Sequence, residues 1–174
     1  MSGESREAVR VVFLAAIMIT SVMAAGVAFS GSAAAANLEV GTDSGYNSIQ
    51  NAVNNASSGD TVSIEPGTYE ESVSVNTDDL TIVGDGAVTI AGSGGGNGFR
   101  LTANGTTIQS VSIINFSNGV KTTDDIQNLR LEDVTMDKNV RGVNINTGDI
   151  NSLTLDGVPI SNATNGLKVS TTAA

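Results

Sequence analysis

The sequence predicts an all-β fold in which short parallel strands stack into a β-solenoid. Three observations lead to this prediction: an apolar pattern that repeats every 23 to 26 residues, strand-like pairs within each repeat, and a glycine at the start of the last pair. Such a period means that one unit cannot bury its own apolar face and must stack on the next. The pattern predicts an architecture and names no reaction.

The repeat is clearest over residues 106–122, 129–145 and 153–169, and a fourth copy over 80–101 fits if loops vary in length. A partial fifth copy has apolar pairs at 62/64 and 73/75. Apolar residues at i and i+2 lie on one face of a strand. Three pairs per copy predict about five coils of three short strands, and hence three parallel sheets. The slots of the last copy hold Leu153, Leu155, Val158, Ile160, Gly166, Leu167 and Val169.

Four glycines share one slot of this repeat, at the third pair: Gly98, Gly119, Gly142 and Gly166. Glycine adopts positive φ without a steric penalty, which suits a sharp corner. We therefore expect these glycines to turn the chain at one corner of every coil.

Residues 1–36 are predicted to be a secretory signal rather than part of the fold. Arg6 and Arg10 precede a 19-residue stretch without charge, and the small residues 31–36 follow it as a cleavage site. An uncleaved membrane anchor is the alternative, because 19 apolar residues just span a bilayer. The leader resembles those of haloarchaeal surface glycoproteins, and we expect a secreted or cell-surface protein.

Composition narrows the classes of function. From residue 37 onward the chain has 16 acidic and 6 basic residues, and the net charge is −10. Such a surface repels nucleic acid and anionic membranes, so neither is an expected partner. The chain contains no Cys and no His, which excludes a disulfide framework and the usual zinc or copper ligands. Acidic, lysine-poor chains of this kind are typical of high-salt organisms, where salt screens the self-repulsion.

Residues 37–59 are predicted to form an N-terminal cap that contains a short helix over 47–56. Ile49, Ala52, Val53 and Ala56 follow a helical period, so one helical face is apolar. Ser48 or its neighbour Asn47 is a suitable N-cap. A helix here would cover strand edges and apolar side chains at the end of the coil.

The segment from Tyr46 to Glu71 resembles the start of the right-handed parallel β-helix, or pectin-lyase-like, superfamily. The matching text is Ser-Ile-Gln at 48–50, Gly-Asp-Thr-Val at 59–62 and Pro-Gly-Thr-Tyr at 66–69. The resemblance implies a cap helix followed by right-handed coils over residues 60–170. It implies no single activity, because the superfamily includes lyases, hydrolases, adhesins and inert surface proteins.

Members that cleave acidic polysaccharides use Asp-bound calcium with a basic residue, or clustered Asp residues. The candidates for such a site are Asp124, Asp125, Asp133, Asp137 and Arg141. No slot of the repeat places acid upon acid, so we interpret these residues as a solvated acidic surface. A polysaccharide lyase or glycoside hydrolase is the alternative to a non-catalytic protein.

No cofactor is expected, with calcium at Asp78–Asp79 or Asp124–Asp125 as the one alternative, although neither pair has a known calcium-loop spacing. Four Asn-x-Ser/Thr sequences are candidate glycosylation sites, and their number is what composition alone predicts. They are Asn55, Asn104, Asn115 and Asn162. Two of these fall in one column of the repeat, in the loop after the second strand.

Residues 171–174 are expected to be a tail that leaves the last coil uncapped. An open coil presents unpaired backbone groups, which suggests a fragment of a longer surface protein, an end that meets another chain, or frayed last turns. We therefore expect an exported cell-surface protein with a structural or interaction role, whose partners are a cell-surface polysaccharide or a surface-layer protein. A carbohydrate-binding adhesin module is a further alternative.

Overall fold

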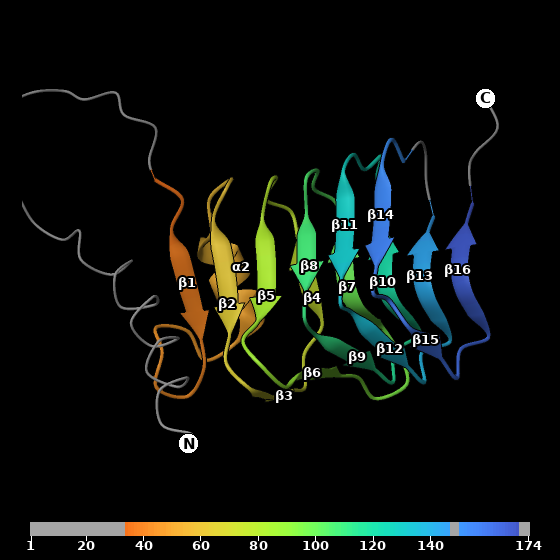
Figure 1. The fold of residues 1–174 in the computed structure, drawn as a ribbon, viewed down its shortest axis with the longest axis horizontal. Helices are drawn as coiled ribbons and strands as arrows, with labels where there is room; N and C mark the ends of the chain where they lie inside the picture. The colour runs from red at the N-terminus through yellow and green to blue at the C-terminus, as the bar shows by residue number, and fades with distance from the viewer. Residues whose placement is uncertain (1–33, 147–149, 171–174) are drawn as a thin grey trace, which may run out of the picture. The chain divides into compact units, whose positions relative to one another are not determined.

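The computed structural model describes residues 34–146 and 150–170. In these residues parallel strands wind into a right-handed β-solenoid, as the repeat and the resemblance predict (Figure 1). The described part contains one helix, α2 (Ile49–Asn55), and no helix there is long and apolar enough to cross a membrane. The charge-free stretch of the predicted secretory signal lies outside the described residues.

The strands form three parallel sheets. Sheet A has six strands, in the order β1 (Asn37–Val40), β2 (Thr61–Ile64), β5 (Thr81–Gly84), β8 (Thr107–Gln109), β11 (Leu129–Glu132) and β14 (Leu153–Asp156). Sheet B has five, β3 (Gly67–Tyr69), β6 (Val88–Ala91), β9 (Ser112–Ile114), β12 (Thr135–Asp137) and β15 (Ile160–Ser161). Sheet C also has five, β4 (Val73–Val75), β7 (Asn97–Leu101), β10 (Asn118–Thr122), β13 (Arg141–Ile145) and β16 (Asn165–Val169).

Each coil runs through sheet A, then sheet B, then sheet C, and the chain passes through all three sheets five times. The register confirms the slots of the repeat. Leu131 lies between Ile108 and Leu155 in sheet A, and Val143 lies between Val120 and Leu167 in sheet C. The recurrent aliphatic side chains therefore share one interior, as stacking strands about 4.8 Å apart requires.

Two strands were not predicted from the sequence pattern. Strand β1 precedes α2 and pairs in parallel with β2, so that Leu38 lies beside Val62 and Val40 beside Ile64. The predicted cap region thus also contains a strand of sheet A. Strand β3 is the second strand of the partial fifth copy, where the sequence showed no apolar pair. In β3 the residue beside Ile90 is Tyr69, an aromatic residue instead of an aliphatic one.

Helix α2 begins as predicted and covers one edge of the solenoid. Ser48 is the N-cap, and its side chain accepts a hydrogen bond from the backbone N–H of Asn51. Ile49, Ala52 and Val53 are fully buried. The helix takes the place that a strand of sheet C would have before β4, since it contacts β4, β1 and β2. The structure thus confirms the predicted N-terminal cap helix.

The prediction for the four glycines of the repeat was wrong about their conformation. None of them has a positive φ, and each is the second residue of a sheet C strand. Close packing explains the glycines instead: a Cβ on Gly119 would lie 2.8 Å from the carbonyl oxygen of Gly142 and 3.1 Å from the sulfur of Met136. The glycines therefore let successive coils approach each other at this edge of sheet C.

The left-handed residues lie at other corners. The corner from sheet A to sheet B has positive φ in four successive coils, at Gly86, Ser110, Asp133 and Gly157. A second column follows sheet B, at Asn115, Lys138 and Asn162, with φ between 49° and 61°. Asn, Asp and Gly tolerate this conformation better than other residues, which accounts for most of these positions.

Candidate functional site

The five residues proposed as a catalytic cluster come from different parts of the coil. Asp124 and Asp125 are exposed in the connection after β10, Asp133 is exposed at the corner between sheets A and B, and Asp137 ends β12. Arg141 begins β13 and is half-buried. Among the described contacts, no hydrogen bond or ion pair joins any two of them. These contacts therefore do not join the five candidates into a carboxylate pair of the kind that glycoside hydrolysis needs. The expectation that no slot places acid upon acid was wrong, because the register sets Glu132 beside Asp156 in sheet A; neither residue belongs to the proposed cluster.

Asp137 is held as a structural anion between two coils. Its Oδ1 accepts hydrogen bonds from Ser161 Oγ and Asn162 Nδ2, both at 2.7 Å. The hydrogen bond from Ser161, followed by that from Asn162, lowers the pKa of Asp137 below its usual value. A carboxylate in this position ties β12 to the coil that follows it.

The candidate glycosylation sites differ in how their side-chain amides are used. Asn55 and Asn162 are exposed, and Asn104 and Asn115 are half-buried. The Nδ2 of Asn55 donates to the carbonyl oxygen of Asn51, and that of Asn162 donates to Asp137. Asn115 and Asn162 both follow strands of sheet B, in the same corner two coils apart. Since Nδ2 is the atom that carries a glycan, attachment at Asn162 would leave one N–H on that atom for the contact with Asp137.

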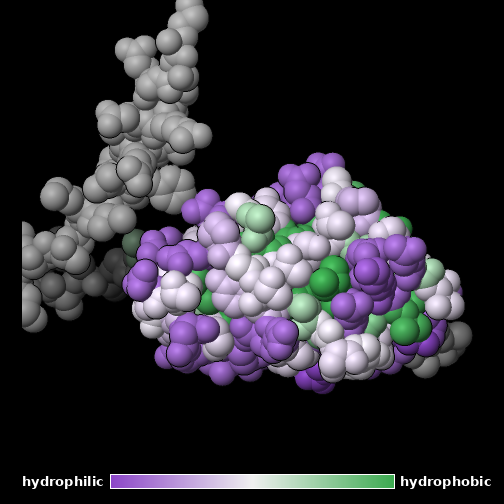
Figure 2. Space-filling model, turned by 90° about the horizontal axis from the view of Figure 1, so that it is seen from below, coloured by the Kyte–Doolittle hydropathy of each residue, from purple (hydrophilic) through white to green (hydrophobic). Residues whose placement is uncertain are grey.

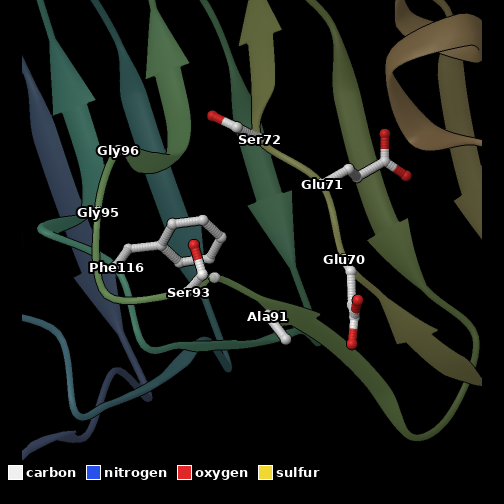
Figure 3. A pocket seen from close by; sticks show the side chains of 9 residues that line it. Glu70, Glu71, Ser72, Ala91, Ser93, Gly95, Gly96 and Phe116 are labelled. Carbon is white, nitrogen blue, oxygen red and sulfur yellow. The ribbon is translucent and has the colours of Figure 1, made fainter.

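One surface hollow has a volume of about 560 Å³ and lies beside the connections that lead into β4 and β7. In Figure 3 the carboxylate of Glu71 is turned toward the helix, where it accepts hydrogen bonds from the backbone N–H groups of Ile49 and Gln50, both at 2.9 Å. The Glu70 carboxylate and the Phe116 ring lie on different sides of the hollow. The lining residues are Glu70, Glu71, Ser72, Ala91, Gly92, Ser93, Gly95, Gly96 and Phe116.

A second, shallower hollow of about 360 Å³ follows the outer face of sheet B and includes Asp133. Its hydroxyl groups are stacked in register, because Ser112 lies between Thr89 and Thr135 in adjacent strands. It contains a single carboxylate and no cation among its lining residues, so it offers no acid–base pair.

The described residues contain no cluster of three or more His, Cys, Asp or Glu side chains with metal-binding geometry. Asp78 and Asp79, one of the proposed calcium pairs, make contacts to protein groups. Asp78 Oδ1 accepts from the backbone N–H of Asn104 at 2.8 Å, and Asp79 Oδ2 accepts from Ser58 Oγ at 3.4 Å. Calcium binding therefore stays the untested alternative to the expectation of no cofactor.

A cationic face on sheet C is the feature that sequence reasoning missed. Its strands contain no acidic residue and four of the six basic residues beyond position 36. Arg100 lies beside Lys121, Lys121 beside Asn144, and Asn144 beside Lys168. Arg141 is in the same sheet. We call Arg100, Lys121, Arg141 and Lys168 the cationic face. Arg100, Lys121 and Lys168 recur in one slot of the repeat, which was the signal for it, whereas Arg141 lies in the slot of Asn118 and Asn165.

Polar side chains beside the cationic face are incompletely satisfied. Asn118 Nδ2 donates to Asn97 Oδ1, and Asn144 Nδ2 donates to Asn118 Oδ1, both at 2.9 Å. This row of amides ends at Asn144 Oδ1, which has no hydrogen-bond partner in the described structure, as is also the case for Arg141 Nε. Asn144 is 5% exposed. Buried polar groups are rarely left without a partner, so this face of sheet C is unusual.

Comparison with known proteins adds no family to this description: no protein-family model, no curated protein and no solved structure matches the chain. The protein is a parallel β-solenoid, and this fold is consistent with the β-helix superfamily that the segment from Tyr46 to Glu71 resembles.

Proposed function

We propose that the protein is an exported, non-catalytic β-helix of the cell surface with a structural role, and that it associates with a second copy through its last coil. The observation that carries this proposal is the exposure of apolar residues that belong to the interior of the solenoid. Leu155, Leu167 and Val169 are 38%, 48% and 50% exposed. Their neighbours one coil earlier, Leu131, Val143 and Ile145, are at most 1% exposed.

The strand edges of this coil support the same interpretation. Strands β14, β15 and β16 are each the last strand of their sheet in the described residues. Their outer edges present unpaired N–H and C=O groups, which are a template for pairing with another chain. Figure 2, which views the molecule from below, shows more hydrophobic surface toward this end than over the first coils. A partner that supplies strands would satisfy both the backbone and the apolar side chains.

Charge favours a second copy in a tail-to-tail arrangement. Residues 37–99 contain nine acidic and no basic residues, whereas residues 150–170 contain one of each, Asp156 and Lys168. The last coil is thus a region where two chains of net charge −10 approach without strong repulsion. A two-fold dimer uses the same patch on both copies, which is the commonest symmetry of soluble oligomers.

Two further observations support a structural role over catalysis. The candidate acids lie in separate parts of the coil, and the contact of Asp137 is structural. The proposed location rests on the leader, whose charge-free stretch lies outside the described residues, and on the acidic composition. An activity screen on acidic polysaccharides, with and without calcium, would detect the alternative, and turnover that Asp133→Ala abolishes would establish it.

Sedimentation of the full-length chain, expressed with its leader and purified as the cell delivers it, tests the proposed association. We expect dimers in concentrated salt, because salt strengthens apolar association. The double variant Leu167→Gln, Val169→Gln should be monomeric. Val140→Gln is the matched control, since Val140 is 44% exposed and lies outside the last coil. A wild-type chain that stays monomeric at high concentration, with a β-sheet circular dichroism spectrum, would refute the proposal.

A further inference from the structure

We propose a second contact between copies of this chain, in which the cationic face of one copy binds the acidic first coils of a neighbour. The inference rests on the proposed structural function and adds to it a polar, side-by-side interface. The partner is identified by charge: residues 37–99 contain nine acidic residues and no basic one. The same chain therefore carries both complementary surfaces, at different levels of the solenoid.

Within the described residues no carboxylate forms an ion pair with the cationic face. The one ion pair recorded in the described residues joins Arg130 to Glu132 on sheet A. Arg100 and Lys121 occupy directly opposite positions on adjacent strands, about 4.8 Å apart, and like charges in such a pair are destabilising. An external anion removes this repulsion, so the pair favours an acidic partner.

The complementary surface lies at the other end of sheet C. Strand β4 is flanked by the acidic pair Glu70–Glu71 on the side of sheet B and by Asp78–Asp79 on the side of sheet A. Glu70, Asp78 and Asp79 are exposed. The hollow of about 560 Å³ beside Glu70 is large enough to receive the end of a lysine or arginine side chain (Figure 3).

The arrangement of the two surfaces determines the kind of assembly. Sheet C runs from β4 to β16 in four strand steps of about 4.8 Å, with acids beside its first strand and cations on the following ones. A neighbour that is shifted along the solenoid axis brings its first coils against the later coils of the first copy. When the neighbour keeps the same axial direction, the contact joins two different patches, is heterologous and continues from copy to copy. Together with tail-to-tail pairing it would extend dimers into an array.

Salt dependence separates this contact from the tail-to-tail dimer. In low salt the full-length chain should sediment as species larger than a dimer, and in concentrated salt as the dimer, since salt screens exposed charges. The variant Arg100→Glu, Lys121→Glu should give dimers in both conditions. Lys138→Glu is the matched control, because Lys138 is an exposed cation outside sheet C, and it should behave like the wild type.

A charge-reversal pair completes the test. Glu70→Lys, which changes an exposed residue without a recorded hydrogen bond, should also lose the larger species. Mixing the Glu70→Lys variant with the double variant Arg100→Glu, Lys121→Glu should restore the larger species in low salt. The double variant Leu167→Gln, Val169→Gln should lose the salt-resistant tail-to-tail dimer and keep the salt-sensitive association through the cationic face. The two contacts can therefore be removed independently. Larger species that persist in Arg100→Glu, Lys121→Glu, or mixtures that do not restore them, would overturn the proposed contact.

Discussion

The first and last coils of this solenoid face the same physical problem and meet it differently. At the first coil, α2 buries Ile49 and Val53 completely, and the side chain of Gln50 pairs with the edge of β4. Its Oε1 accepts from the backbone N–H of Ser74 at 2.6 Å, and its Nε2 donates to the carbonyl oxygen of Ser74 at 3.2 Å. One amide side chain thus replaces a neighbouring strand.

At the last coil no such replacement exists in the described residues. Leu167 and Val169 remain about half exposed, and β16 has one neighbour, β13. The comparison shows that a repeat determines the interior of a solenoid and leaves its ends to other devices. An end that is covered by its own chain is a cap, and the end that is left apolar in the described residues is where we propose an interface.

The largest effect on the free energy of unfolding should appear when the leucine of one slot is replaced by alanine, in separate variants, in the last coil and in the coil before it. Leu131→Ala removes a fully buried side chain and should lower the free energy of unfolding by about 2–5 kcal/mol. Leu155→Ala, in the same slot one coil later, should cost only about 1 kcal/mol, because 38% of that residue is already exposed. Denaturant unfolding at a dilution that keeps the chain monomeric measures both. Equal losses would mean that the last coil is as well covered as the interior.

A second matched pair tests the close approach of the coils at the glycine column. A Cβ on Gly142 would lie 2.6 Å from the carbonyl oxygen of Gly166 and 2.8 Å from Ile160, whereas a Cβ on Gly166 has nothing nearer than 4.0 Å. Gly142→Ala should therefore destabilise by about 1–3 kcal/mol through overpacking. Gly166→Ala should be close to neutral in the monomer. A neutral Gly142→Ala would instead leave the glycine column without an explanation.

The sequence predicted the repeated strands of the solenoid well and the elements outside the repeat poorly. The recurrent aliphatic slots predicted three sheets and about five coils because burial imposes the same side-chain chemistry on each coil. Strand β1 was overlooked although Leu38 and Val40 precede Val62 and Ile64 by 24 residues, since two apolar residues alone are a weak signal.

The missed features of the candidate site have a physical origin as well. A glycine such as Gly142 is required either by a positive φ or by a close contact, and the sequence does not distinguish these two causes. Outward slots tolerate most residues, so the alignment of Arg100 with Lys121 became meaningful only once the register was known. The role of Asp137 depends on Ser161 and Asn162, which belong to a later coil.

A smaller effect is expected from opening the covered end. Gln50→Ala removes both hydrogen bonds to Ser74 and should destabilise the protein by about 1 kcal/mol, since water replaces part of the loss at this exposed strand. Asn54→Ala is the control, because Asn54 lies on the same helix and its recorded partner is Gln50 rather than β4. Hydrogen exchange at Ser74 should accelerate in Gln50→Ala and stay unchanged in Asn54→Ala. Unaltered exchange in both variants would show that the helix backbone alone caps this end.

The smallest effect concerns the polar tie of the last coil. Because hydrogen bonds from Ser161 and Asn162 lower the pKa of Asp137, its contribution to stability is present above the ordinary aspartate pKa of about 4 and is lost as pH falls through the lowered value. Acid should therefore loosen β15 as the pH falls through this lowered pKa. Asp137→Asn should lack this part of the pH dependence, whereas Asp133→Asn, at an exposed corner one strand earlier, should retain it. Protection of the Lys138 backbone N–H, which donates to the carbonyl oxygen of Ser161, is the local readout. If that protection is the same above and below the transition in the wild type, the carboxylate does not hold the last coil in place.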